Sequence, residues 1–182
     1  VITNDDPQPT VTVAASTASI GESPATVDFT VTLSAAASGD VSLDYATVEG
    51  TATADADFSS TAGTLVIPEG ETSAAVSVGV LDDLLDEHDE EFSVEIGSVS
   101  GAALGAPSTA VVTILDDDPQ PELMLSVSDP IVGEDAGSVT FTARLSTASG
   151  RPVSFDHATV GATATSGADF EAVSGSTTLA PG

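Results

Sequence analysis

The feature that most constrains this chain is an internal repeat with an offset of 112 residues. The string Asp-Asp-Pro-Gln-Pro occurs at 5–9 and again at 117–121, and sliding the chain by 112 residues aligns the rest without a gap. Of the 70 overlapping positions, 29 are identical, which indicates a duplicated structural unit. The sequence therefore predicts residues 1–6 as the tail of a preceding repeat, 7–118 as one complete repeat and 119–182 as the first part of another.

Apolar and polar residues alternate along each copy with the period of a β-strand and not with that of a helix. Gly, Pro and Asp separate the alternating runs, as is typical of antiparallel β-sandwiches. The predicted fold class is therefore all-β, with tandem seven-stranded antiparallel sandwiches of immunoglobulin-like type, the second of them incomplete. The Pro-Gln-Pro segments are expected to be short, stiff junctions. In the complete repeat the strands are expected at 10–14, 27–33, 41–45, 64–67, 76–81, 92–96 and 110–114.

The charge balance excludes several classes of partner. The chain has 29 acidic and 2 basic residues, which gives a formal net charge of −27. Nucleic acids and anionic membranes are bound through Lys and Arg, so neither is an expected partner. No apolar run approaches the length of a membrane span, and no membrane insertion is expected. Multivalent cations are the natural partners of such a chain, although solubility or adaptation to salty water also explains a high net charge.

The acidic residues gather where the predicted strands end. Asp82 and Asp83 follow one strand, residues 86–91 precede the next, and Asp116–Asp118 follow the last. If consecutive strands are antiparallel, these clusters return to the same end of the sandwich and meet. Two like charges about 4 Å apart repel by about 4 kcal/mol at an effective dielectric constant near 20. So many carboxylates in one place therefore indicate a bound cation.

Calcium suits these donors best. It takes about 6–8 oxygen ligands from carboxylates and carbonyls in flexible geometry, whereas magnesium keeps more water. Zinc would require cysteine or several histidines, and the chain has no Cys and two His. For Asp82, Asp83 and Asp116–Asp118, metal binding is the expected role. Asp89 and Glu91 are interpreted as solvated residues that flank a strand.

Several separated motifs resemble the Calx-β domain, and they occur in the order of that family. The resemblance covers the complete repeat and continues through 119–182 as far as that copy goes. It implies a seven-stranded sandwich of the kind found in sodium–calcium exchangers, in an integrin tail and in many bacterial surface and adhesion proteins. In the complete repeat the motifs are Asp-Tyr-Ala-Thr-Val-Glu-Gly-Thr-Ala-Thr at 44–53, Ala-Asp-Phe at 56–58, Gly-Thr-Leu-Val-Ile-Pro-Glu-Gly at 63–70, Val-Leu-Asp-Asp at 80–83, Asp-Glu-Glu-Phe at 89–92 and Val-Thr-Ile-Leu-Asp-Asp-Asp at 112–118.

The resemblance also implies calcium ions at one end of the sandwich, near the junction to the next domain. The second copy matches this ligand set at Glu134 and Asp169, and the tail of the preceding repeat matches it at Asn4, Asp5 and Asp6. Ca²⁺ is the expected cofactor. In the complete repeat the implied ligands are Glu22, Asp57, Asp82, Asp83, Glu87, Glu90, Asp116, Asp117 and Asp118, with the backbone carbonyl of Leu85.

The sequence contains no catalytic motif, and an enzyme is not expected. The leading hypothesis is a calcium-binding structural repeat of a long extracellular adhesin, stalk or fibre, in which calcium stiffens the junctions. Its partners would be neighbouring repeats or subunits of the same protein and a ligand on a cell surface or in a matrix. The alternatives are a filament subunit assembled by strand complementation between chains, an accessory module of a secreted enzyme, and a calcium sensor of a transporter.

Overall fold

The computed structural model describes residues 7–133 and 137–182, and the regular elements in these ranges are all β-strands. None of the described segments forms a helix that is long and apolar enough to cross a membrane. The strands are β1 (Thr10–Ala15), β2 (Ser19–Gly21), β3 (Ala25–Leu33), β4 (Val41–Glu49), β5 (Ala62–Ile67), β6 (Ser73–Val80), β7 (Glu90–Ser100), β8 (Ala103–Leu104), β9 (Thr109–Leu115), β10 (Leu123–Val127), β11 (Phe141–Leu145), β12 (Val153–Ala158) and β13 (Ser174–Leu179).

The chain divides into two compact units, and each is a structure in its own right. The first unit consists of the chain up to Asp83 and of His88–Asp117. The second consists of Leu84–Glu87 and of Asp118–Gly182. The segment 84–87 thus lies between β6 and β7 in the sequence, but it is part of the second unit.

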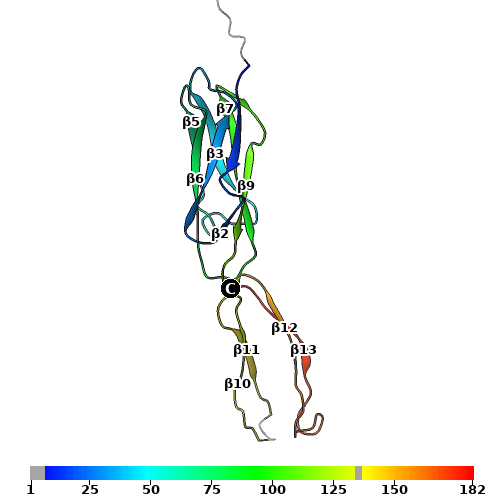
Figure 1. Ribbon diagram of the computed structural model, residues 1–182. Coiled ribbons are helices and arrows are strands. Elements are labelled where there is room, and N and C mark those ends of the chain that lie inside the picture. The colour runs from blue at the N-terminus through cyan, green and yellow to red at the C-terminus, as the bar shows by residue number, and fades with distance from the viewer. Residues whose placement is uncertain (1–6, 134–136) are drawn as a thin grey trace, which may run out of the picture. The chain divides into compact units, whose positions relative to one another are not determined.

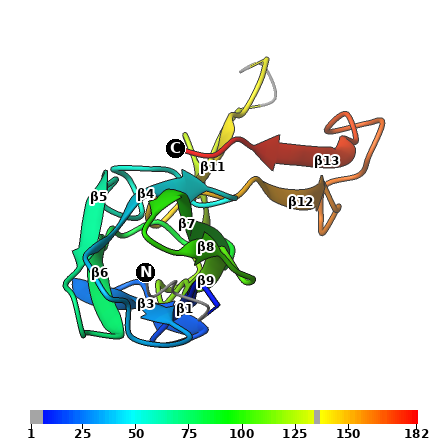
Figure 2. The ribbon, with the colours of Figure 1, turned by 90° about the horizontal axis from the view of Figure 1, so that it is seen from above.

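The first unit is a sandwich of two β-sheets (Figure 1). One sheet has the strand order β6-β3-β1-β8, and the other has the order β2-β9-β7-β4-β5. Viewed from above, the layer that contains β1 and β3 faces the layer that contains β4 and β7 (Figure 2). The long strands pair in antiparallel fashion. The predicted all-β sandwich is confirmed.

The core of this sandwich follows from the alternation in the sequence. In β3 the side chains of Val27, Phe29 and Val31 are buried, and the intervening residues face outward. Three aromatic rings meet in the core: Phe92 stacks on Phe58 with ring centroids 4.5 Å apart, and Phe29 meets Phe92 edge-on at 5.9 Å. These three rings therefore pack against one another among the aliphatic side chains of the core.

Two short strands, β2 and β8, were not predicted from the sequence. β2 pairs in parallel with β9, and β8 pairs in parallel with β1. They have three and two residues, so they are too short to show an alternating pattern. The remaining strands of the first unit overlap the seven that the sequence predicted.

The second unit contains two antiparallel ribbons, β10 with β11 and β12 with β13. Their registers repeat those of the first unit at the 112-residue offset. Val11 pairs with Leu33 in β1 and β3, and Leu123 pairs with Leu145 in β10 and β11. In the same way the β4–β5 register reappears in β12 and β13. The duplication seen in the sequence is therefore also a duplication of strand pairing.

Candidate metal centre

A tight turn at residues 53–58 fixes the position of Asp57. One carboxylate oxygen of Asp57 accepts a hydrogen bond from the Thr53 N–H at 2.6 Å, and the Asp57 N–H donates to the Thr53 carbonyl at 3.0 Å. The next residue, Phe58, is fully buried and anchors the turn in the core. Asp57 itself is only 7% exposed. The turn therefore holds a buried carboxylate in a defined orientation.

Within the same turn Asp55 has a left-handed backbone, with φ of 63°, a conformation that Asp tolerates better than most residues. Its exposed carboxylate accepts hydrogen bonds from the Ser60 N–H at 3.0 Å and from the Ser60 hydroxyl at 2.9 Å. Both bonds favour the charged form and hold the pKa of Asp55 below its ordinary value. Folding lowers this pKa, so Asp55 contributes stability above its unfolded-state pKa. That contribution is lost as the pH falls through the folded-state pKa.

We expect Ser60→Ala to raise the pKa of Asp55 toward its ordinary value without restoring it fully. The substitution removes the hydroxyl donor but keeps the backbone N–H, which is the larger cause of the shift. The measurement is an NMR titration of the Asp55 carboxyl carbon in the parent chain, in Ser60→Ala and in the neighbouring Ser59→Ala as control. An unchanged Asp55 titration in Ser60→Ala would contradict this account of the turn.

Glu22 reaches the same end of the first sandwich through the parallel pairing of β2 with β9. The Glu22 N–H donates to the carbonyl of Leu115, the last residue of β9, at 2.9 Å. This bond places Glu22 beside Asp116, which follows Leu115 directly in the chain. Glu22 is 5% exposed, so a second carboxylate is buried at this end. The short strand that the sequence did not predict is thus the element that positions this acid.

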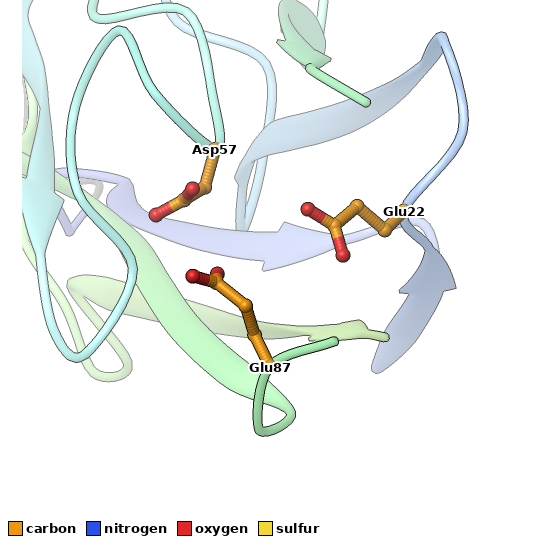
Figure 3. A group of neighbouring side chains, drawn as sticks. All are labelled: Glu22, Asp57 and Glu87. Carbon is orange, nitrogen blue, oxygen red and sulfur yellow. The ribbon is translucent and has the colours of Figure 1, made fainter. Parts of the chain in front are cut away.

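Two groups of carboxylates form around Glu22. In the first, one oxygen from each of Glu22, Asp57 and Glu87 lies within 4.8 Å of the others. Figure 3 shows these three side chains converging from separate stretches of chain. In the second group, one oxygen from each of Glu22, Asp116 and Asp118 lies within 4.8 Å of the others. Glu22 belongs to both groups and therefore connects them.

The remaining implied ligands belong to neither group. Asp117 accepts a long hydrogen bond of 3.4 Å from the Ser23 hydroxyl, next to Glu22 in the chain. Asp82 is exposed, and Asp83, Leu85 and Glu90 are partly buried. These residues stay predicted ligands.

The donor chemistry fits calcium. Calcium–oxygen distances are about 2.3–2.6 Å, so two oxygens on one ion lie at most about 5 Å apart. In each group the carboxylate oxygens lie within 4.8 Å of one another, which meets this condition. All five residues offer carboxylate oxygen, the donor that calcium prefers. Burial of Glu22 and Asp57 makes their mutual repulsion more costly than on an open surface, and a divalent cation would offset it.

Asp86 was not among the predicted ligands, and the structure gives it a different partner. It is 4% exposed and forms an ion pair with Arg151, whose Nε donates to a carboxylate oxygen at 3.1 Å. The Ser149 hydroxyl donates to the same oxygen at 3.4 Å, and the Gly150 N–H donates to the Asp86 carbonyl at 3.1 Å. All four residues belong to the second unit. The Arg151 guanidinium therefore anchors the segment 84–87 within the second unit.

Replacing Arg151 with Met should destabilise the second unit by about 1–3 kcal/mol, because the buried carboxylate of Asp86 loses its charged partner. The expected signal is a roughly tenfold or larger increase in amide exchange at Gly150, measured by NMR. Arg144→Met is the matched control, since Arg144 is exposed and is the other basic residue of the chain. Equal exchange rates at Gly150 in both variants would show that the ion pair does not hold this segment.

The second copy repeats the turn but not its surroundings. Asp169 accepts a hydrogen bond from the Thr165 N–H at 2.7 Å, as Asp57 does from Thr53. Gly167 occupies the position of Asp55 and is also left-handed, with φ of 83°. Asp169 is exposed, however, and belongs to neither carboxylate group. Glu134, the other predicted ligand here, lies outside the described residues, as do Asn4, Asp5 and Asp6.

Comparison with known proteins agrees with this architecture. Residues 4–118 and 119–182 each match the family model of the Calx-beta domain. Sodium/calcium exchanger 1 of Canis lupus familiaris is 40% identical over 96 residues, which are 43% of this chain and 10% of the exchanger. Sodium/calcium exchanger 3 of Rattus norvegicus is 38% identical over 105 residues, 44% of this chain and 11% of that protein. This chain thus matches about a tenth of the length of these exchangers.

Solved structures show the same fold. The crystal structure of CBD12 from CALX1.2 superposes with a TM-score of 0.56 at 27% identity, and the match covers 94% of this chain and 70% of that one. The apo-form Calx CBD1 domain gives a TM-score of 0.57 at 29% identity, over 62% of this chain and all of that one. The predicted tandem arrangement is therefore confirmed. The detected domains are non-catalytic, and the chain belongs to the Calx-beta family, with two tandem Calx-beta domains.

Proposed function

We propose that this chain binds calcium in its first Calx-beta domain, at the end where Glu22 meets two further pairs of acids. The observation that carries the proposal is the convergence of Glu22, Asp57 and Glu87 within 4.8 Å, with Glu22 and Asp57 buried. Calcium would supply the positive charge that these carboxylates need. The chain supplies the orientation: the turn at 53–58 fixes Asp57, and the β2–β9 pairing fixes Glu22.

Calorimetric titration of the whole chain with calcium, and separately with magnesium, tests this proposal. We expect saturable calcium binding that is much tighter than magnesium binding, because the site offers many carboxylates in flexible geometry. Glu22→Gln should weaken binding most, since Glu22 belongs to both carboxylate groups. Glu95→Gln, a change at an exposed acid in β7, is the control for net charge. Equal heats for the two variants would exclude the proposed site.

We further propose that the chain is part of an extracellular array of such domains, such as an adhesin or stalk, in which calcium stiffens the junctions. The support is the position of the acids: Asp116 and Asp118 contribute to a carboxylate group and run directly into the Pro-Gln-Pro segment 119–121. Small-angle scattering with calcium and with chelator checks this idea. Particle dimensions that do not change on chelation would contradict a stiffening role.

A second candidate is a calcium-sensing part of a membrane transporter. It is favoured by the identity of 38–40% to sodium/calcium exchangers over about a hundred residues. The two candidates differ in where the native protein places these domains. Protease treatment of intact cells, with detection by an antibody against the first domain, should remove an extracellular array. A transporter domain on the inner side of the membrane would survive until the cells are opened.

A further inference from the structure

A single peptide group at the end of β9 links two residues of the second carboxylate group. Its carbonyl, that of Leu115, accepts a hydrogen bond from the Glu22 N–H at 2.9 Å. Its N–H, that of Asp116, donates to a carboxylate oxygen of Asp89 at 3.2 Å. Asp89 is exposed and belongs to neither carboxylate group of the described residues. The carboxylate of Asp89 therefore holds the peptide plane from which Asp116 projects.

Glu49 has the same relation to the turn that carries Asp57. The Ala54 N–H donates to a carboxylate oxygen of Glu49 at 2.9 Å. The preceding amide, that of Thr53, donates to the Asp57 carboxylate at 2.6 Å. Two successive amides of the turn are thus held by two carboxylates, and only Asp57 belongs to a carboxylate group. Glu49 is an exposed residue at the end of β4, and it acts on the turn through the backbone.

The start of β7, which follows Asp89, is itself fastened to the end of β4. The Glu91 N–H donates to the Thr51 hydroxyl at 2.9 Å, and the Ala52 N–H donates to the Glu91 carbonyl at 3.0 Å. A Cβ atom at Gly50 would lie 2.4 Å from that carbonyl oxygen, so the two backbones are in direct contact. Asp89 therefore projects from an anchored strand start, and its hydrogen bond can fix the position of a neighbouring segment.

The equivalent turn of the second copy forms without the carboxylate of Glu49. Gly161 has the repeat position of Glu49. The turn nevertheless keeps the hydrogen bond from the Thr165 N–H to Asp169 at 2.7 Å. Removing the carboxylate of Glu49 should therefore leave the turn of the first copy folded. Its effect should be limited to how firmly the turn is held.

We propose that Asp89 and Glu49 are positioning residues of the calcium site. Asp89 orients Asp116, and Glu49 orients Asp57, each by holding a backbone amide and not by coordinating the ion. This inference rests on the proposed calcium binding, and it assigns part of the negative charge at this end to hydrogen bonding. Loss of one such hydrogen bond should weaken calcium binding about three- to tenfold, because the freed ligand has to be ordered again when the ion binds.

The test compares Asp89→Ala with Asp89→Asn by calorimetric calcium titration of the whole chain. Both variants lose the same charge, but asparagine keeps an oxygen that can accept the Asp116 N–H. We expect Asp89→Ala to bind calcium about three- to tenfold more weakly than Asp89→Asn, and the pair Glu49→Ala and Glu49→Gln to differ in the same direction. Glu95→Ala, at an exposed acid of β7, is the control for net charge. Equal affinities of the alanine and amide variants overturn the proposal.

Amide exchange in excess chelator, measured by NMR, separates this inference from the calcium proposal. The Asp116 amide should exchange several-fold faster in Asp89→Ala than in Asp89→Asn, while the amide of Phe92 in the core exchanges equally in both. Faster exchange of Phe92 in Asp89→Ala would show a general loss of stability and overturn the positioning role. A parent chain that binds no calcium would overturn the calcium proposal itself. Calcium binding by the parent with equal Asp116 exchange in the two variants would overturn the positioning role alone.

Discussion

Asp57→Asn should abolish most of the calcium-dependent rise in the melting temperature of the first unit. At a calcium concentration one hundred times the Kd, one site stabilises the folded state by about 2.7 kcal/mol. For a domain of this size that is a rise of roughly 10–20 °C. Asparagine removes a charged ligand but keeps an oxygen that can accept the Thr53 N–H, so the turn itself should survive. Without calcium the variant should melt higher than the parent, because one buried like charge has been removed.

Asp169→Asn is the matched control for this change. Asp169 has the same repeat position as Asp57, and it accepts a hydrogen bond from a threonine N–H in the same way. It belongs to neither carboxylate group of the described residues. Tyr45 provides the measurement, since it is the one tyrosine of a chain without tryptophan and lies in β4 of the first unit. Its fluorescence therefore reports the unfolding of that unit. If calcium raises the melting temperature of Asp57→Asn as much as that of Asp169→Asn, Asp57 is not a ligand.

The sequence predicts the fold well because the fold depends on local alternation. In β1, β3 and β6 apolar residues occupy every second position, and most of them are buried in the core. Alternation cannot predict how very short segments pair with strands that lie far away in the sequence. β2 is such a segment, and it brings Glu22 beside Asp116 through a parallel pair with β9. The position of Glu22 followed from family resemblance and not from the pattern itself.

The sequence also predicts that acids from separate strand ends meet, and the structure brings five of them together. The sequence does not show which group each of these acids contacts. Asp86 and Glu87 are adjacent and look alike in sequence, yet Asp86 pairs with Arg151 and Glu87 joins Glu22 and Asp57. The pairing of Asp86 depends on a residue 65 positions away with no counterpart in the first copy, where Gly39 stands at that place. A repeat pattern contains no signal for such a contact.

Phe29→Ala should destabilise the first unit by about 3–5 kcal/mol, which is the usual cost of removing a buried phenylalanine from a core. The side chain is fully buried and meets Phe92 edge-on, so its loss leaves a cavity and removes an aromatic contact. Domains of this size are stable by about 5–15 kcal/mol, so the variant should unfold at a much lower denaturant concentration. Chemical denaturation followed by Tyr45 fluorescence measures the change.

Phe141→Ala tests whether this loss of stability depends on the burial of the ring or only on the residue type and its repeat position. Phe141 has the same residue type, the same repeat position and the same strand register as Phe29, but it is largely exposed. Its removal should cost the second unit no more than about 0.5 kcal/mol, as for other surface substitutions. Amide exchange in β10 and β11, which belong to the second unit, measures this change. A large increase in exchange there would mean that Phe141 is buried in solution.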